Sequence, residues 1–337
     1  MISIILVTYN SSEFIARCLD SWQASAAEIV VVDNASADGT ADLIRERYPT
    51  VKLFSSVSNL GFAAAANLGA RHSTGSALLF LNPDTVCVDP IAPLEEALES
   101  SESVAAVAPR LVDGQGRTQI GFTVRRLPTA APLAFEILLL NRLFPRNPVN
   151  RRYRCLDLDH DRPAEVEQPA GACLLVRRSR FEACGGFDEN FFPLWFEDVD
   201  LCKRLREQGG RILFRPQVRV QHHGAHSVES LTFSEKQIYW YRNMLYYVHK
   251  HFSWRTRWAI RGALLGGMGV RILAEFGGMA ETPQAPTPPR RERIRGYWKT
   301  AKLSVWGWRS GGRSRSNAAQ KLPRSSEGGW LGENRWG

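Results

Sequence analysis

The stretch ISIILVTYNSSEFIARCLDSW, residues 2–22, contains the two patterns that decide the fold. A mostly apolar run ends at three polar residues, Thr8, Tyr9 and Asn10. Apolar residues then recur at helical spacing, after Ser11 or Ser12 as the helix cap. A buried strand followed at once by an amphipathic helix is the repeating unit of α/β proteins.

The same pattern returns along the first quarter of the chain. The further strands are EIVVVD (28–33), VKLFSS (51–56) and ALLFL (77–81), and helices are predicted at 43–48 and 61–71. Strands that are apolar throughout and alternate with helices predict an α/β fold, with a mostly parallel, Rossmann-like sheet and helices on both faces. Such sheets bind ligands at the carboxyl ends of their strands.

Each predicted strand ends in polar residues. These ends are Thr8-Tyr9-Asn10, Asp33-Asn34, Asn59 after the third strand, and Asn82-Pro83-Asp84. Because parallel strands present their carboxyl ends at one edge, we expect these residues to lie together.

The second half is less regular. Residues 110–168 are rich in Gly, Pro and Arg and predict a long connection that carries an amphipathic segment, which faces either the core or a membrane. Three more strands are predicted at 172–178, 211–216 and 218–223. An acidic helix at about 196–208 precedes the last two strands, and an aromatic helix at 234–252 follows them.

Positive charge gathers at the end of the chain. The net charge is +9, and residues 281–337 hold 12 Lys and Arg against 4 Asp and Glu. This asymmetry argues against nucleic-acid binding by the folded core and favours a basic segment that meets an anionic membrane surface. Between Arg261 and Arg271 only nine uncharged residues occur, too few to cross a bilayer. The helix at 254–276 therefore either lies at a membrane interface or packs on the domain.

The first residues and the cysteines bear on the compartment. MISIILVTYN has no basic leader and too short an apolar run for a signal peptide. The six cysteines show no metal-finger spacing and are expected to be buried, reduced thiols. A cytoplasmic protein is expected.

Six motifs together carry a family resemblance. They are SIILVTYNS, EIVVVDNASADGT, SNLGFAAAANLGA, LLFLNPDT, GGFDENFF and FEDVDLCKRLREQG. In this order they resemble the family 2 inverting glycosyltransferases, most of all the rhamnosyltransferase-like members, over about residues 1–250. The resemblance implies the GT-A fold of nucleotide-diphospho-sugar transferases. Its nucleotide-sugar-binding half would be 1–110 and its acceptor-binding and catalytic half 111–252, followed by basic membrane-proximal helices at 253–309 and a disordered tail at 310–337.

The resemblance also implies a metal site. The pyrophosphate of a nucleotide sugar needs a divalent cation, Mg²⁺ or Mn²⁺, as it leaves. In the family an Asp-x-Asp sequence ends this strand, and here Asn82 replaces the first acid while Asp84 keeps the second. His222 aligns best as a further ligand, with His223 as the alternative, and only one of these neighbours can face the site. Asp84 as a simple turn residue, and a histidine outside any site, are the alternatives.

The donor is expected at the strand ends. By resemblance Asp33 meets the edge of a uracil or thymine base, although it also suits a turn. The other expected donor-binding residues are Thr8, Tyr9, Asn10, Asn59, Gly61, Asn67 and Asn82. Gly61 is expected for its backbone freedom.

Three acids open the acidic helix. Glu197, Asp198 and Asp200 suit the helix dipole, but acids this close also raise one another's pKa, as a general base requires. By resemblance Asp198 is the base that deprotonates the acceptor hydroxyl, with Glu197 in support. Asp200 and Trp195 are expected to contact the acceptor, although core packing is the more frequent use of a residue such as Trp195.

The expected function is metal-dependent, inverting transfer of a sugar, with rhamnose from dTDP-rhamnose as the first choice and a UDP sugar as the second. The acceptor would be a glycan or a polyprenyl-linked glycan of cell-surface polysaccharide synthesis, met at the inner face of the cell membrane. One alternative is a non-catalytic membrane-surface module that binds glycan or nucleotide. Another is a sugar-nucleotide pyrophosphorylase, although VTYNSSEF lacks the Gly-rich basic loop which that enzyme needs.

Overall fold

The computed structural model describes residues 1–23, 28–224, 231–277 and 288–306. Residues Met1–Gly307 form one compact unit. The disordered tail expected at 310–337, and parts of the helical segment expected at 253–309, lie outside the described residues.

The main sheet has the strand order β3-β2-β1-β4-β10-β6-β11-β5, with β8 also paired to β11. Its strands are β1 (Ile2–Thr8), β2 (Glu28–Asp33), β3 (Lys52–Ser55), β4 (Ala77–Leu81), β5 (Thr85–Cys87), β6 (Val104–Val112), β8 (Ala164–Val166), β10 (Cys173–Arg177) and β11 (Arg211–His222). A second, two-stranded sheet pairs β7 (Val124–Arg125) with β9 (Gln168–Pro169).

The first four strands in chain order are parallel, as expected. β1 pairs with β2 in a register that sets Thr8 opposite Asp33, and with β4 in a register that sets Leu6 opposite Leu81. The carboxyl ends of β1, β2 and β4 therefore lie at the same edge of the sheet.

Beyond β4 the sheet is mixed. β10 runs antiparallel between β4 and β6, so its first residue, Cys173, lies opposite the last residue of β4, Leu81. The two strands expected at 211–216 and 218–223 form one strand, β11, with a register shift between Arg215 and Arg219. The parallel partner of β11 is β6, which ends inside the region expected to be a long connection, 110–168.

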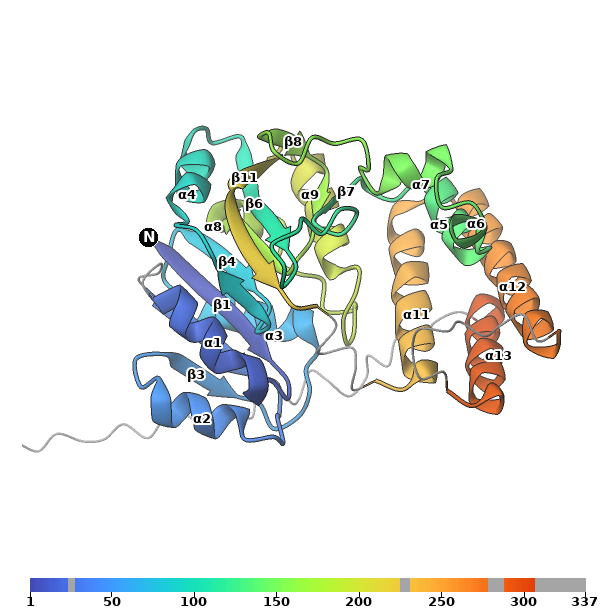
Figure 1. Cartoon of the computed structure of the whole chain (residues 1–337), viewed down its shortest axis with the longest axis horizontal. Helices are drawn as coiled ribbons and strands as arrows, with labels where there is room; N and C mark the ends of the chain where they lie inside the picture. Colours follow the sequence, from blue (N-terminus) through green and yellow to red (C-terminus); the bar gives the residue numbers. More distant parts are fainter. Residues whose placement is uncertain (24–27, 225–230, 278–287, 307–337) are drawn as a thin grey trace, which may run out of the picture. The chain divides into compact units, whose positions relative to one another are not determined.

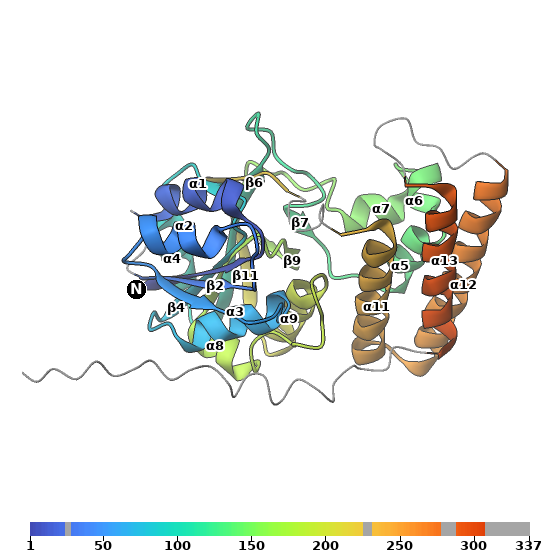
Figure 2. The same ribbon diagram turned by 90° about the horizontal axis from the view of Figure 1, so that it is seen from below.

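Helices cover both faces of the main sheet (Figure 1). One face packs on α1 (Ser12–Trp22), α2 (Thr40–Arg47) and α4 (Ala92–Glu99), and the other on α3 (Phe62–Arg71), α8 (Arg178–Ala183) and α9 (Glu197–Glu207). Figure 2 shows these two helical layers on opposite sides of the strands. The core consists of apolar strand residues such as Ile4 and Leu6 toward the first layer and Ile5 toward the second.

The remaining helices pack mainly on one another. They are α5 (Ala130–Ile137), α6 (Leu140–Leu143), α7 (Pro148–Tyr153), α11 (Phe233–His251), α12 (Trp254–Phe276) and α13 (Arg290–Trp306). α11, α12 and α13 contact each other, and α12 also contacts α5. Among the described helices, none combines the length and the apolar character needed to cross a membrane.

All six cysteines are free. Cys18, Cys173 and Cys202 are buried, as expected, whereas the other three are partly exposed. Burial raises the pKa of the Cys18 thiol to about 12, so this side chain is a protonated, unreactive part of the core.

Candidate active site

Asp84 and His222 lie together at the carboxyl edge of the sheet. Antiparallel pairing of β5 with β11 sets His222 opposite Thr85, the residue after Asp84. His222 Nε2 is 3.7 Å from Asp84 Oδ2, which also accepts a hydrogen bond of 2.9 Å from the backbone N–H of Gly224. Both side chains are about 5% exposed, so this carboxylate–imidazole pair is held inside the protein.

Gln119 fixes the orientation and tautomer of His222. Its Nε2 donates to the carbonyl oxygen of His222 over 2.8 Å, and this identifies the other amide atom, Oε1, as the acceptor. Oε1 is 3.1 Å from His222 Nδ1, so Nδ1 carries the proton. The lone pair of Nε2 is thereby left toward Asp84.

Phe122 and Arg125 support the same imidazole. The ring of Phe122 stacks on His222 with a centroid distance of 5.1 Å and an interplanar angle of 4°. Arg125 lies over the Phe122 ring, with Cζ 5.6 Å from the centroid. The segment from Gln119 to Arg125 therefore holds His222 by hydrogen bonds and by stacking.

His223 faces elsewhere. Its ring is 5.7 Å from that of Phe14, and its Nε2 is 3.5 Å from Arg17 Nη1, both on α1. Of the two neighbouring histidines, His222 is thus the one beside Asp84, as alternation along a strand requires.

The donor set fits a cation that also binds phosphate. Within the described ranges no cluster of three or more His, Cys, Asp or Glu side chains is arranged to hold a metal, so Asp84 and His222 would supply two ligands. Mg²⁺ and Mn²⁺ sites of this kind take their other oxygens from substrate phosphates and water. Burial lowers the pKa of His222 and keeps the imidazole neutral, the form that binds metals.

Asp33 is buried at the end of β2, with 2% exposure, and its carboxylate is already engaged. Oδ1 accepts hydrogen bonds from the hydroxyls of Thr8 (2.9 Å) and Ser36, and Oδ2 accepts one from the backbone N–H of Ser36 (3.0 Å). The turn anticipated as an alternative for Asp33 is therefore present. Thr8 lies beside Asp33, at the end of β1.

Other residues expected to bind the donor shape the loops at this edge. Asn10 accepts a hydrogen bond from the backbone N–H of Ala37, and Asn59 accepts one from that of Gly61. Gly61 adopts φ +80°, and a Cβ there would lie 2.7 Å from the Phe192 ring, so both backbone freedom and close approach require glycine. Tyr9 and Asn82 remain partly exposed at the strand ends.

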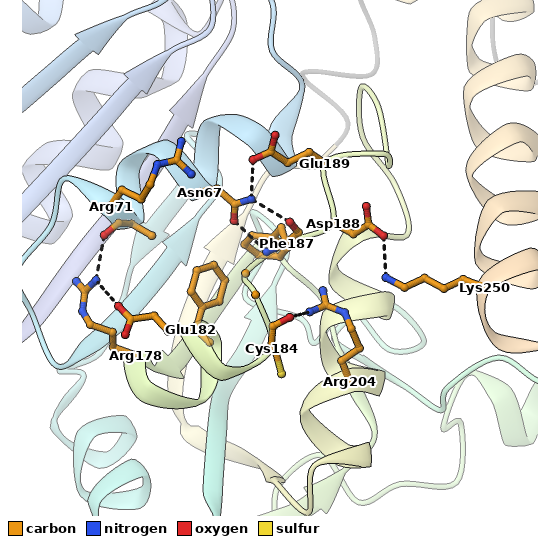
Figure 3. Close-up of a pocket in the computed structure, with 14 residues that line it drawn as sticks. Asn67, Arg71, Arg178, Glu182, Cys184, Phe187, Asp188, Glu189, Arg204 and Lys250 are labelled. Atoms are coloured by element: carbon orange, nitrogen blue, oxygen red, sulfur yellow. Dashed lines mark hydrogen bonds and ion pairs between the residues drawn. The ribbon is translucent and has the colours of Figure 1, made fainter. Parts of the chain in front are cut away.

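Asn67, expected to contact donor hydroxyls, hydrogen-bonds to the loop after α8. Its Nδ2 donates to the carbonyl oxygen of Phe187 and to Glu189, and its Oδ1 accepts from the Phe187 N–H. These bonds pin the loop after α8 against α3. Figure 3 shows Asn67 at a cavity of about 630 Å³ whose lining does not include Asp33, Asp84 or Asp198.

Asp198 opens α9 and is anchored by backbone groups. Its Oδ2 accepts hydrogen bonds from the Gly171 N–H (3.0 Å) and, at 3.4 Å, from Gln168 Nε2, and its Oδ1 accepts from the Val199 N–H. Burial raises its pKa despite these bonds and the nearby charge of Arg125. A held carboxylate with a raised pKa is suited to act as a general base.

In the part of the chain that the structure describes, Glu197 lacks the side-chain hydrogen bonds that anchor the adjacent Asp198. Its side chain is buried, and Oε2 has no hydrogen-bond partner among the described residues. Burial, and then the adjacent charge of Asp198, raise its pKa well above the usual range. A protonated Glu197 beside an ionised Asp198 avoids two adjacent buried charges.

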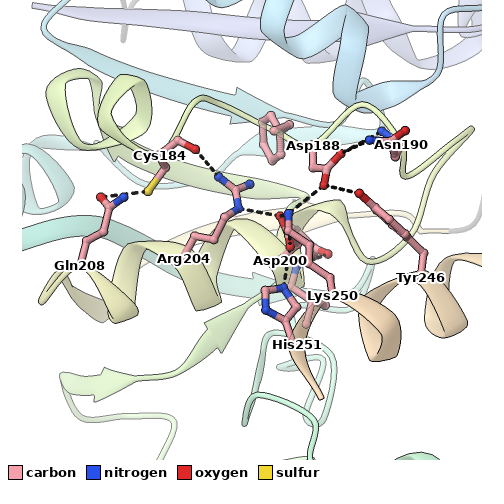
Figure 4. A network of polar contacts seen from close by, with 12 residues as sticks. Cys184, Asp188, Asn190, Asp200, Arg204, Gln208, Tyr246, Lys250 and His251 are labelled. Carbon is pink, nitrogen blue, oxygen red and sulfur yellow. Dashed lines mark hydrogen bonds and ion pairs between the residues drawn. The ribbon is translucent and has the colours of Figure 1, made fainter. Parts of the chain in front are cut away.

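Asp200, expected to contact the acceptor, lies in a buried ion-pair network. It is fully buried and accepts hydrogen bonds from Arg204 (2.7 Å) and His251 (2.7 Å), and Lys250 Nζ lies 2.8 Å from Oδ1. Lys250 also binds Asp188 over 2.7 Å. Figure 4 shows that this network joins α9 to the end of α11, so Asp200 positions the helix that carries Asp198.

Trp195 precedes these acids and is partly exposed. Both Trp195 (φ +77°) and Phe196 (φ +72°) have left-handed backbone conformations. Such conformations are costly for bulky residues and gather at functional sites.

The Asp84–His222 pair and the general-base candidate, Asp198, lie at the same edge of the sheet. The backbone N–H of Asn82 donates to the carbonyl oxygen of Ala172 over 3.0 Å, and the next residue back, Gly171, donates to Asp198. Two hydrogen bonds, by way of Asn82, Ala172 and Gly171, thus connect the end of β4 to Asp198. This arrangement suits chemistry that joins a phosphate-bound cation to proton removal nearby.

Sequence reasoning missed Gln119, Phe122, Arg125, Gln168 and Gly171. The first three lie in a segment, QIGFTVRR, that was interpreted as irregular connection. For Gly171 a signal existed, because a glycine flanked by alanines directly before a strand indicates a close backbone approach.

The chain is similar in sequence to known glycosyltransferases. The family model described as "Glycosyl transferase family 2" matches residues 3–182. The chain is 30% identical over 283 residues to N-acetylglucosaminyl-diphospho-decaprenol L-rhamnosyltransferase of Mycobacterium tuberculosis, covering 78% of this chain and 90% of the relative. It is 24% identical over 251 residues to rhamnosyltransferase WbbL of Escherichia coli K12, covering 72% and 89%.

Two solved structures share the fold. GalNAc-T7 with UDP, GalNAc and Mn²⁺ superposes with a TM-score of 0.53 at 16% identity, over 91% of this chain and 56% of that one. A mannosyltransferase of Pyrobaculum calidifontis in complex with GDP-Man and Mn²⁺ gives 0.51 at 17% identity, over 90% and 87%.

Fold and site together define a GT-A glycosyltransferase. The chain belongs to glycosyltransferase family 2 and is rhamnosyltransferase-like within it.

Proposed function

We propose that this enzyme transfers rhamnose from dTDP-rhamnose to a sugar hydroxyl of a polyprenyl-diphosphate-linked glycan, with inversion at the anomeric carbon. The observation that carries the proposal is the pairing of an anchored carboxylate, Asp198, with the Asp84–His222 pair at the same sheet edge. The choice of sugar and acceptor follows the mycobacterial relative, whose name specifies rhamnosyl transfer to N-acetylglucosaminyl-diphospho-decaprenol. The dTDP nucleotide follows from the family resemblance of the sequence motifs.

In the proposed reaction Asp198 takes the proton of the acceptor hydroxyl. The hydroxyl oxygen forms its bond to the anomeric carbon from the face opposite the nucleotide, the bond from that carbon to the diphosphate breaks, and dTDP leaves with the bonding electrons. Asp84 and His222 would hold Mg²⁺ or Mn²⁺, which supplies charge neutralisation for the diphosphate. Gln119 keeps Nε2 of His222 unprotonated for that purpose.

Thr8 and Asp33 lie at the ends of neighbouring strands of the same edge. Because both oxygens of Asp33 already accept hydrogen bonds from Thr8 and Ser36, this carboxylate is rigid. We assign it to the edge of the thymine base, where a fixed acceptor selects a base that carries an N–H. A lipid-linked acceptor places the enzyme at the cytoplasmic face of a membrane, as a peripheral protein.

Transfer to a short-chain polyprenyl-diphosphate glycan tests the proposal directly. dTDP-rhamnose, UDP-N-acetylglucosamine and GDP-mannose are offered in parallel, with Mn²⁺ and again with excess EDTA, and products are identified by mass. We expect a deoxyhexose addition from dTDP-rhamnose alone, abolished by EDTA. Transfer from another donor would overturn the assignment of the sugar. Transfer in the presence of EDTA would overturn the proposed dependence on a divalent metal.

Nucleotide binding separates the enzyme from a non-catalytic module. A module would bind dTDP or glycan without making product, and chelation would leave its behaviour unchanged. If no dTDP or UDP sugar raises the melting temperature of the wild-type protein, the whole donor assignment fails.

A further inference from the structure

α12 has two different faces. Its buried residues, Ile260, Leu264, Gly267, Met268 and Glu275, recur at helical spacing along one side. This side packs on α5, α11 and α13, and the approach is close enough that a Cβ on Gly267 would lie 2.5 Å from the carbonyl oxygen of Ile137. The packed alternative for the 254–276 helix is therefore correct for this side.

The opposite side is apolar and exposed to solvent. It carries Trp254 (65% exposed), Trp258 (64%), Leu265 (41%), Val270 (51%), Leu273 (71%) and Phe276 (68%). At about 100° per residue these six side chains fall within one half of the helix, and they extend over its whole length of about 33 Å. Single exposed apolar residues are ordinary, but a continuous row marks an interaction surface.

Arginine side chains border this row at both ends. Arg255 lies over the Trp254 ring (5.5 Å) and Arg261 over the Trp258 ring (5.6 Å), while Arg290 of α13 lies over the Phe276 ring (4.7 Å). The one acid of α12, Glu275, is buried and paired with Arg293. The exposed side of α12 is thus apolar along its length and cationic at its ends.

A small cavity of about 200 Å³ lies where α11 meets the start of α12. Leu245 and Val248 give it apolar walls, and Trp254 and Trp258 lie beside His249, Arg257 and Arg261 in the rest of its lining. Two guanidinium groups beside aromatic rings suit one phosphate group attached to an apolar chain.

We propose that the α12 face, defined as Trp254, Trp258, Leu265, Val270, Leu273 and Phe276 with Arg255 and Arg261, docks on an anionic phospholipid bilayer. The helix lies in the interface with its apolar row among the acyl chains, and the cavity receives a lipid phosphate. Tryptophan rings bordered by arginine match the polarity of the interface between lipid headgroups and acyl chains. The inference rests on the proposed function, since it explains how the enzyme meets a lipid-linked acceptor.

Vesicle co-sedimentation of the full chain tests the docking without donor or acceptor. The vesicles are phosphatidylcholine alone, or the same lipid with one third phosphatidylglycerol. We expect binding to the anionic vesicles, about ten-fold weaker partitioning for the Trp254→Ser/Trp258→Ser variant, and loss of the preference for anionic lipid in Arg255→Gln/Arg261→Gln. High salt should weaken binding of the wild type.

The control variant is Val57→Ser, which removes an apolar side chain that is 90% exposed in the β3–α3 loop. It should bind vesicles as the wild type does. The inference is overturned if the tryptophan variant binds like the wild type, if Val57→Ser loses as much binding, or if sedimentation shows a wild-type dimer that the tryptophan variant dissociates. Circular dichroism and the melting temperature establish that each variant is folded. Transfer to a water-soluble acceptor, measured without vesicles, tests the proposed function separately.

Discussion

Gly171 donates its backbone N–H to Asp198 over 3.0 Å, at a position where no side chain fits. A Cβ on Gly171 would lie 2.9 Å from Asp198 Cβ and 3.3 Å from its Oδ2. The shortest contact of Asp198 Oδ2 is therefore with the main chain just before β10, and the side chain of Gln168 adds a longer one.

Replacing Gly171 by Ala should displace the Asp198 carboxylate while leaving the fold intact. A shift of this kind costs about 10²-fold in kcat, because proton transfer depends on the geometry of the base. Gly114→Ala is the matched control, since its Cβ would meet only Gln221 Nε2 at 3.7 Å. Steady-state kinetics measure kcat of both variants. Equal kcat values for Gly171→Ala and Gly114→Ala would contradict a role of Asp198 as the base.

Asp198→Asn should lower kcat by about 10²–10⁴-fold, the usual contribution of a general base. Because burial raises the pKa of Asp198, wild-type activity should fall with decreasing pH at a higher pH than an ordinary aspartate would give. The residual activity of the variant should lack this acid limb. Glu46→Gln, an exposed acid on α2, serves as the control and should keep the wild-type profile. An acid limb that persists in Asp198→Asn would assign it to another group.

Gln119→Leu should weaken Mn²⁺ binding by about 10- to 100-fold, because the tautomer and orientation of His222 are no longer fixed. Gln119→Glu keeps the acceptor for Nδ1 and should lose less. Electron paramagnetic resonance of bound Mn²⁺ in the presence of dTDP measures this independently of turnover. Equal Mn²⁺ affinity in Gln119→Leu and the wild type would show that His222 is not a ligand.

Asp200→Asn should destabilise the protein by about 3–5 kcal/mol, because it leaves Arg204 without the charge of this fully buried carboxylate and Lys250 with Asp188 alone. Glu207→Gln on the same helix breaks the surface pair with Lys203 and should cost less than about 1 kcal/mol. Urea unfolding measures both values. Similar values for the two variants would contradict the structural role of Asp200.

Glu197→Gln should stabilise the protein increasingly as the pH rises. The folded state holds the pKa of Glu197 well above 4.5, so on raising the pH the unfolded chain loses this proton first, and the wild type loses stability until the folded pKa is reached. The variant has no such proton to lose. Melting temperatures of the two proteins, compared from pH 5 to pH 8, should diverge in favour of the variant, and parallel curves would refute the raised pKa.

The sequence was sufficient for the first four strands, β1 to β4. β1, β2 and β4 are short apolar runs with polar stops, and Asp33 and Asp84 were placed at one edge from that pattern alone. β6 was missed because VAAVAPRLV combines small residues with Pro109 and Arg110, a composition that indicates no strand. Pro109 is tolerated there since it lies at the register shift of β11.

The rest of the site depended on which strands become neighbours. Gly171 meets Asp198 because β10 is antiparallel to β4, and Gln119 meets His222 because β11 lies beside β6. Neither pairing follows from local pattern. The hydrogen-bond partners of Asn67 and Asp200 could not be predicted for the same reason, since they lie 120 and 51 residues away along the chain.

The chain from the end of β6 to the start of β10 is one long segment, and both of its ends contact residues of the candidate active site. Gln119 and Phe122 near its start grip His222, Gly171 at its end anchors Asp198, and α5 in its middle packs on α12. A chimaera of two relatives that exchanges only part of this segment would separate residues that contact one another across the sheet edge. A working chimaera has to exchange this whole segment together with α12.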